Sequence, residues 1–294
     1  MTAGISRVEA VVLSCLTSAA ESLFATLFPA DCRLCSSPLT KISRLPVCEE
    51  CLASVRPITG GLCSICGERI LSPYAFADAQ EAPLCGICRR LKPAYVKAAA
   101  YGSYEGGLRD LIHLLKYEHV RPAANVLGRM LAEVISKLAP EFGDPAPIVI
   151  PVPLHQRKYH ERGFNQAELI SQAALKLKFA GLDLRLATDV LKRTRATLSQ
   201  TGLSSHQRRE NMRGAFELEK TAKVVDKSIL LVDDVFTTGT TISECARVLQ
   251  RAGARRIWVA TVARTLKVEA VGAQIASHKE EDEFTAPAAM AAHV

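Results

Sequence analysis

The chain has 294 residues, of which 48% are hydrophobic and 23% are charged, as in ordinary soluble globular proteins. This composition excludes a wholly disordered chain and a collagen-like one, and the length suggests about two domains. The net charge of +7 allows anionic partners such as phosphates or nucleic acid, but it does not select among them.

Residues 1–28 are predicted to contain a short amphipathic helix. The apolar stretch from Val11 to Phe28 is interrupted by serines and by Glu21, so no uninterrupted run reaches the roughly 18 residues that a membrane-spanning helix needs. The basic lead-in of a signal peptide is also missing. We therefore expect no membrane span, no targeting segment and a cytoplasmic protein.

Eight of the ten cysteines form four Cys-x-x-Cys pairs in a short segment. The pairs are Cys32/Cys35, Cys48/Cys51, Cys63/Cys66 and Cys85/Cys88. Two such turns supply the tetrahedral four-sulfur shell that zinc prefers, and a filled shell leaves no open position for a substrate. We therefore expect residues 29–95 to form a double zinc ribbon with two structural zinc ions. The spacing allows consecutive pairs to share a zinc ion, and it equally allows an interleaved arrangement.

The alternatives for the cysteines are a thioredoxin-like redox pair and thiols that pack as small apolar groups. Four pairs in one segment favour zinc over both. The same segment carries seven of the fourteen prolines and little helical periodicity, so bound metal would have to supply folding energy. The remaining thiols, Cys15 and Cys245, are predicted core residues.

Residues 96–275 show alternating helix and strand patterns. Helices are predicted over Leu108–Lys116, Ala123–Leu138, Glu161–Phe179 and Thr240–Arg251, and strands over Ile148–Val152, Ala215–Leu218, Ser228–Val232 and Ile257–Ala263. This alternation predicts an α/β domain with a mostly parallel sheet flanked by helices, which binds its ligand at the carboxyl ends of the strands. Residues 276–294 are charged and then alanine-rich, and we expect a disordered tail.

One predicted strand runs directly into a threonine-rich loop and then a helix. The segment is Asp233-Asp234-Val-Phe-Thr237-Thr238-Gly239-Thr240-Thr241. The threonine hydroxyls and the N–H groups of the helix N-terminus suit a phosphate, and Gly239 lets the backbone approach it. The two carboxylates suit the vicinal hydroxyls of a ribose. A threonine-rich helix cap and an acidic metal site are the alternatives, whereas a Walker loop is excluded because no Gly-Lys-Ser/Thr follows.

This loop closely resembles the phosphoribosyl pyrophosphate (PRPP) signature of type I phosphoribosyltransferases. Further motifs are Leu111-Ile-His-Leu-Leu-Lys116-Tyr, Pro151-Val-Pro153-Leu, Arg162-Gly163-Phe164-Asn165-Gln166 and Arg193-Thr-Arg195. With the paired ribbons, they make the chain from about Pro29 to Ala263 resemble the ComF family. The resemblance implies a double zinc ribbon ahead of a type I phosphoribosyltransferase-like domain, magnesium bound with PRPP, and a role in DNA uptake by competent bacteria.

Phosphoribosyl transfer expels pyrophosphate, so cationic side chains are the expected catalytic groups. The candidates are Arg157, Lys158, Arg162 and Arg195, and the polar stretch Lys192–Arg213 is predicted to be a mobile basic loop. For any one of these arginines, a solvated surface position is the alternative.

Two functions remain open. The first is a magnesium-dependent phosphoribosyltransferase with an unidentified acceptor, with single-stranded DNA and competence or DNA-processing proteins as partners. The second is a non-catalytic nucleic-acid-handling protein with an inherited sugar-phosphate pocket. Aromatic residues for base stacking are scarce, at 5%, and the candidates are Tyr74, Phe76, Tyr95, Tyr101 and Tyr104.

Overall fold

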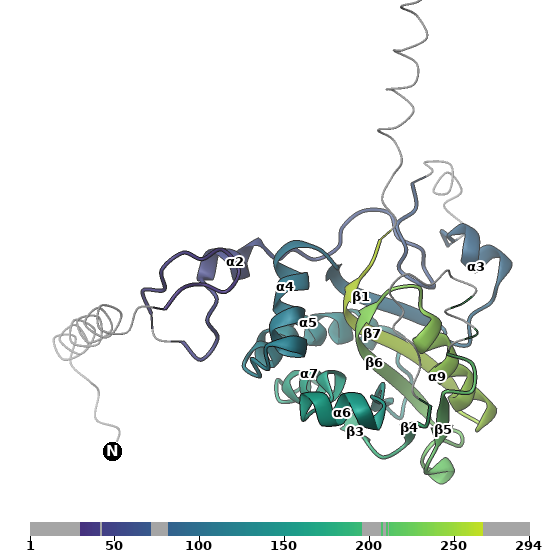
Figure 1. Ribbon diagram of the computed structural model, residues 1–294. Coiled ribbons are helices and arrows are strands. Elements are labelled where there is room, and N and C mark those ends of the chain that lie inside the picture. The colour runs from purple at the N-terminus through teal and green to yellow at the C-terminus, as the bar shows by residue number, and fades with distance from the viewer. Residues whose placement is uncertain are drawn as a thin grey trace, which may run out of the picture.

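The computed structural model describes residues 30–41, 43–71, 82–195, 207, 210 and 212–266 (Figure 1). Several predictions lie outside these residues: the N-terminal helix, the C-terminal tail, Cys15, Tyr74, Phe76 and most of the basic loop. Across the described segments, every helix is too short or too polar to cross a bilayer.

A five-stranded sheet forms the centre of the fold, in the order β1-β7-β6-β2-β3, with every neighbouring pair parallel. The strands are β1 (Lys97–Ser103), β2 (Ile148–Pro151), β3 (Arg185–Leu186), β6 (Ser228–Phe236) and β7 (Arg256–Arg264). Strands β6 and β7 are apolar and buried over most of their length, as parallel strands covered on both faces must be. The predicted α/β fold is confirmed.

Helices cover both faces of the sheet (Figure 1). Leu230 and Val232 of β6 pack with α4 (Gly106–Tyr117), α5 (Ala123–Leu138) and α7 (Gln166–Leu175), whereas Ile229 and Leu231 pack with α9 (Thr240–Arg251). Helices α5 and α7 approach closely at Gly128, where an added Cβ would lie 2.5 Å from the Cβ of Ala173. Two short 3-10 helices, η2 (Ala139–Glu141) and η3 (Thr221–Lys223), complete the described elements of this domain together with α6 (Gln156–Arg162), β4 (Leu191–Arg193) and β5 (Phe216–Leu218).

The single helix predicted over Glu161–Phe179 is wrong. The structure has two helices there, α6 (Gln156–Arg162) and α7. Gly163 ends α6 in the left-handed conformation, with φ of 72°, which a glycine adopts without strain. Asn165 then begins α7, because its side chain accepts a hydrogen bond from the N–H of Ala167 at 3.0 Å.

Three strands were missed in the sequence, and one of them, β3, has only two residues. The first, β1, contains three consecutive alanines, which have low strand propensity, and it was therefore not predicted. Another, β4 (Leu191–Arg193), pairs with β5 (Phe216–Leu218) in an antiparallel ribbon, so the predicted mobile loop is wrong at its first residues. The buried Leu191 and the stacking of Arg193 on the Phe216 ring, 5.6 Å away, hold this strand in place.

The two cysteine-rich ribbons repeat one local structure. In each, a Cys-x-x-Cys turn is closed by a backbone hydrogen bond, from Cys32 N to Ser37 O in the first ribbon and from Cys63 N to Glu68 O in the second, both at 2.8 Å. The helices α2 (Glu49–Ser54) and α3 (Gly86–Arg90) begin directly after the first cysteine of the other pair. A sequence repeat of paired cysteines has therefore become a structural repeat.

The ribbons lie on opposite sides of the sheet edge formed by β1 (Figure 1). Leu45 and Val47 of the first ribbon join the core on the α4 and α5 face, whereas Ile65 of the second packs into the core on the α9 face. The linker between them donates from Ile58 N to Tyr101 O at 2.7 Å, and Ala98 N donates to Ile65 O at 2.6 Å. These bonds cover an edge strand that would otherwise expose unpaired backbone groups.

Candidate functional site

The sulfur atoms of the eight paired cysteines form two clusters. Cys32, Cys35, Cys48 and Cys51 make the first cluster, and Cys63, Cys66, Cys85 and Cys88 make the second, with all ligand atoms in a cluster within 4.8 Å of one another. Consecutive pairs therefore come together, and the interleaved arrangement, which the spacing also allowed, is not the one found.

The geometry of both clusters fits a tetrahedral zinc ion. Zinc–sulfur bonds of about 2.3 Å in a tetrahedron place neighbouring sulfurs about 3.8 Å apart. The Sγ–Sγ distances are 3.9 Å from Cys32 to Cys51, 3.7 Å from Cys35 to Cys48 and 3.6 Å from Cys66 to Cys85.

Backbone donors favour the metal-binding thiolate form of one ligand of the first cluster, Cys32. The N–H groups of Leu34 and Cys48 donate to Cys32 Sγ at 3.4 and 3.3 Å. Burial would raise the pKa of Cys32, but these donors lower it to about 6. The prediction of core packing holds for Cys245, which is fully buried on α9 away from both clusters.

The phosphate loop, which we define as residues 237–241, joins β6 to α9. Gly239 occupies the N-cap of α9 with φ of 72°, and a glycine has no side chain to satisfy the N–H groups of the first helical turn. Thr237 and Thr238 are exposed, and the hydroxyls of Thr238 and Thr240 are 2.8 Å apart. The loop thus presents hydroxyls and a helix N-terminus at the carboxyl end of β6, an arrangement suited to an anion.

The two adjacent carboxylates have different surroundings. Asp234 is buried and forms an ion pair with Lys116 of α4, whereas the side chain of Asp233 is on the opposite face of β6, as strand alternation requires. Burial and the charge of Asp234 raise the pKa of Asp233 well above its ordinary value. Burial alone would lower the pKa of Lys116, but Asp234 raises it. The negative charge of Asp233 is therefore less fully neutralised than that of Asp234, which forms the ion pair with Lys116.

Three of the four predicted catalytic cations lie on α6, which follows the carboxyl end of β2. Arg157 and Lys158 both pair with Glu161, at 3.1 and 2.8 Å, and their side chains are exposed. Arg162 donates to Gln166 Oε1 at 2.8 Å. The fourth, Arg195, donates to the carbonyl oxygen of Arg213 at 2.9 Å and so joins the two ends of the basic loop. These partners of the four cations, Glu161, Gln166 and Arg213, lie outside the phosphate loop.

An exposed aromatic surface beside α6 was missed in the sequence. Tyr117 at the end of α4 is 61% exposed, Tyr159 of α6 is 48% exposed, and the guanidinium of Arg162 lies 5.3 Å from the Tyr117 ring. Among the predicted stacking residues, by contrast, Tyr95 is buried. No local pattern could have shown this, because Tyr117 and Tyr159 come from separate helices.

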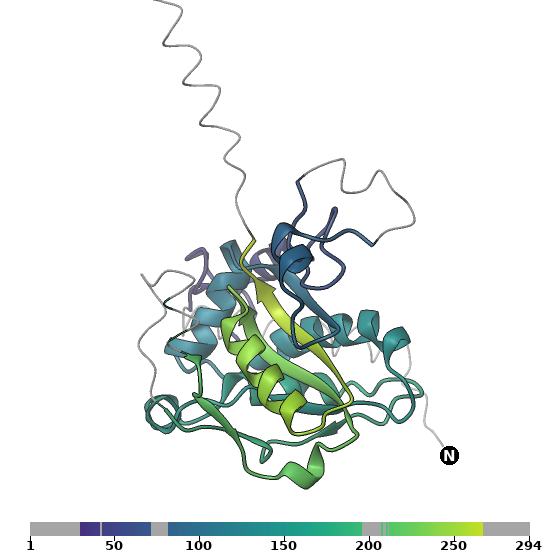
Figure 2. The same ribbon diagram turned by 90° about the vertical axis from the view of Figure 1, so that its right-hand side faces the viewer.

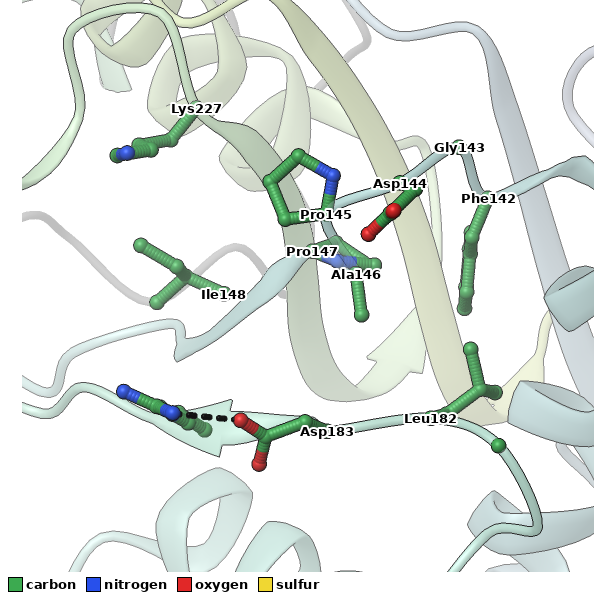
Figure 3. A pocket seen from close by; sticks show the side chains of 12 residues that line it. Phe142, Gly143, Asp144, Pro145, Ala146, Pro147, Ile148, Leu182, Asp183 and Lys227 are labelled. Carbon is green, nitrogen blue, oxygen red and sulfur yellow. Dashed lines mark hydrogen bonds and ion pairs between the residues drawn. The ribbon is translucent and has the colours of Figure 1, made fainter.

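A pocket of about 690 Å³ lies at the other end of the sheet (Figure 3). Its lining includes Ile148 at the start of β2, Lys227 just before β6, and Asp183, which pairs with Arg185 at 2.6 Å. These are amino ends of strands, whereas the phosphate loop follows the carboxyl end of β6. The pocket is therefore separate from the phosphate loop.

Known proteins match both parts of the chain. A double zinc ribbon domain model matches residues 23–89, and a phosphoribosyl transferase domain model matches residues 163–284. DNA utilization protein YhgH of Escherichia coli O6:H1 is 32% identical over 240 residues, which cover 81% of this chain and 98% of that protein. Competence protein F of Haemophilus influenzae is 33% identical, covering 74% and 96%, and Competence protein ComFC of Bacillus subtilis is 24% identical, covering 70% and 79%.

Proposed function

The chain belongs to the ComF family, with a double zinc ribbon and a type I phosphoribosyltransferase-like domain, and from this premise we propose that it binds PRPP and magnesium while handling single-stranded DNA. The observation that carries the first half of the proposal is the phosphate loop. Its helix N-terminus has a glycine at the N-cap, and its exposed threonines, Thr237 and Thr238, follow the partly buried Asp233 at the end of β6.

Each part of PRPP has a counterpart among these residues. The 5-phosphate accepts hydrogen bonds from the phosphate loop, and the ribose hydroxyls donate to Asp233, with Asp234 held behind by Lys116. A carboxylate with a raised pKa, as Asp233 has, is stabilised by hydroxyl donors or by a divalent cation, so this residue fits both. Magnesium bound with PRPP supplies neutralisation of the pyrophosphate charge.

The proposed reaction is transfer of the phosphoribosyl group to an acceptor. Arg157, Lys158, Arg162 and Arg195 are the cations that would meet the departing pyrophosphate, and Arg157 and Lys158 would exchange Glu161 for it. The four-cysteine clusters would hold zinc as structural ions, since every ligand position is filled by a thiolate.

Calorimetric titration with PRPP and magnesium tests the donor site. We expect saturable binding to the zinc-loaded protein and a loss of affinity of about 10- to 100-fold for Asp233→Asn, because hydrogen bonds to a charged group are worth about 1.5–3 kcal/mol. Asp183→Asn is the matched control, since Asp183 lies at the other end of the sheet. Equal affinity of wild type and Asp233→Asn would contradict the placement of the ribose.

Release of pyrophosphate separates an enzyme from a binding protein. PRPP binding with pyrophosphate release on addition of a nucleic-acid or nucleotide acceptor would support the transferase. Binding without release across such acceptors would favour the second function, a non-catalytic nucleic-acid-handling protein, and its specific support is the aromatic surface beside α6.

That surface combines rings with positive charge. Tyr159 and Arg162 are three residues apart on α6 and so share a face, and Arg162 stacks on Tyr117. Bases of a single strand stack on exposed rings without regard to sequence, while arginine and lysine contact the phosphates. We therefore propose that single-stranded DNA binds to the aromatic surface beside α6.

Replacing Tyr117 and Tyr159 together by alanine should weaken binding of a labelled oligothymidine, measured by fluorescence anisotropy. Each stacked base is worth about 1–3 kcal/mol, so we expect a loss of at least about tenfold. The control is the double replacement by phenylalanine, which keeps both rings and should bind as the wild type does. If the alanine variant kept full affinity, the DNA would have to bind elsewhere.

A further inference from the structure

One buried arginine joins the second cysteine cluster to the sheet. Arg264, the last residue of β7, is only 4% exposed. Its Nη1 donates to the carbonyl oxygen of Cys66 at 2.6 Å, and its Nη2 donates to Glu68 Oε2 at 3.0 Å and to Cys66 Sγ at 3.8 Å. Figure 2 shows the blue segment of the second ribbon beside the end of the yellow strand β7. The ribbon therefore fixes the position of this guanidinium.

The other side of the same guanidinium faces the Phe236 ring, on which the phosphate loop lies. It lies 4.4 Å from the centroid of the Phe236 ring, and Phe236 and Arg264 are partners in the β6–β7 ladder. The Phe236 ring is buried and also meets Tyr95 edge-on at 6.5 Å. A Cβ added to Gly239 would lie 2.4 Å from Phe236 Cζ, so the backbone of the loop rests directly on this ring.

In its described residues, the first ribbon differs from the second at this position. The shared hydrogen-bond pattern places Ser37 where the second ribbon has Glu68, and Ser37 is exposed. The ion pair between Arg33 of the first ribbon and Glu118, the residue after α4, lies at the surface. Two ribbons with the same local fold thus differ in their connection to the site.

We propose that metal binding by the second cluster positions the phosphate loop, with Arg264 and Phe236 as the positioning residues, and that the first cluster has no such effect. The metal holds the turn from Cys63 to Cys66 in one geometry, and Cys66 and the neighbouring Glu68 supply the acceptors of Arg264. Without the metal, the buried guanidinium of Arg264 loses its hydrogen-bond partners and moves. The Phe236 ring, which lies between Arg264 and Gly239, then moves as well. As far as it concerns ligand binding, this inference rests on the proposed PRPP site.

The test compares Cys85→Ser with Cys48→Ser, which are equivalent because each cysteine directly precedes the short helix of its ribbon. Cys85 is chosen because Arg264 forms its hydrogen bonds with the segment that holds the other cysteine pair of the cluster. The substitution therefore leaves the hydrogen-bond acceptors of Arg264 in place. Three quantities are measured: zinc content, PRPP affinity, and amide exchange without PRPP. The amides of Ser243 and Thr265 are the probes, since they donate to Gly239 O at 2.8 Å and to Phe236 O at 3.0 Å.

Each variant should lose one of two zinc ions. In Cys85→Ser the exchange of both probe amides should accelerate at least about tenfold and PRPP affinity should fall by a similar factor, as expected when a charge-assisted bond is lost. In Cys48→Ser, the exchange rates of the probe amides and the PRPP affinity should match those of the wild type. A Cys85→Ser protein that has lost its zinc but keeps wild-type exchange overturns the proposal.

Arg264→Lys decides the matter if Cys85→Ser does not fold. Lysine keeps the charge but has no planar group to stack on Phe236 and no second donor nitrogen to reach both acceptors, so we expect both zinc ions to be retained and exchange at Ser243 and Thr265 to accelerate. Wild-type exchange in this variant would overturn the proposal. If the wild type did not bind PRPP, the proposed function would fail, while the exchange comparison would still decide the role of the cluster.

Discussion

Replacing Gly239 by alanine is expected to lower PRPP affinity at least about 100-fold while the sheet stays folded. The new Cβ would lie 2.4 Å from Phe236 Cζ, and the φ of 72° disfavours any residue with a Cβ. The loop must therefore move away from the ring, and several hydrogen bonds to the phosphate, each worth about 1.5–3 kcal/mol, are lost together. Isothermal calorimetry with PRPP and magnesium measures the effect.

Gly181→Ala is the matched control for this change. Gly181 has nearly the same φ, 73°, but a Cβ there meets nothing within 4 Å. The Gly181→Ala variant should have the same unfavourable backbone conformation but should bind PRPP as the wild type does. If Gly239→Ala bound PRPP with wild-type affinity, the phosphate could not be contacting this loop.

Replacing Lys116 by methionine should lower the free energy of unfolding by about 3–5 kcal/mol, because it leaves a buried carboxylate without its partner. The side chains of Lys116 and Asp234 are 14% and 5% exposed, so water cannot replace the lost charge. Urea unfolding of the zinc-loaded protein measures the change.

The exposed pair of Lys41 and Glu49 supplies the comparison. Its side chains are 65% and 81% exposed, and Lys41→Met should cost at most about 1 kcal/mol. Adding Asp234→Asn to Lys116→Met removes the uncompensated charge and should restore part of the stability. Loss of the same free energy by the Lys41 and Lys116 variants would mean that the Lys116 pair is hydrated after all.

Features set by nearby residues could be predicted from the sequence. The Cys-x-x-Cys turns and the helix over Ala123–Leu138 each depend on a few consecutive residues or on one periodicity, and the structure has both. The break at Gly163 was also local, but the apolar pattern continues across it, and this hid the left-handed residue.

Features set by distant residues could not be predicted in the same way. The choice between consecutive and interleaved cysteine pairs depends on how the ribbons fold, and the spacing alone allowed both. Lys116 meets Asp234, and Arg264 meets Glu68, only after the sheet has brought separate segments together. Strand β1 has little strand propensity of its own and owes its conformation to its neighbour β7.

The position of β7 also affects the order in which the chain can be completed on the ribosome. This strand is the last described element to be synthesised, yet it lies between β1 and β6, and Lys97 pairs with Trp258 across most of the chain. Until β7 emerges, β1 and β6 of the nascent protein each have an unpaired edge, and the five-stranded sheet cannot form. Any product that ends before Arg256 would keep both edges exposed, which makes premature termination in the last part of the gene a source of aggregating chains.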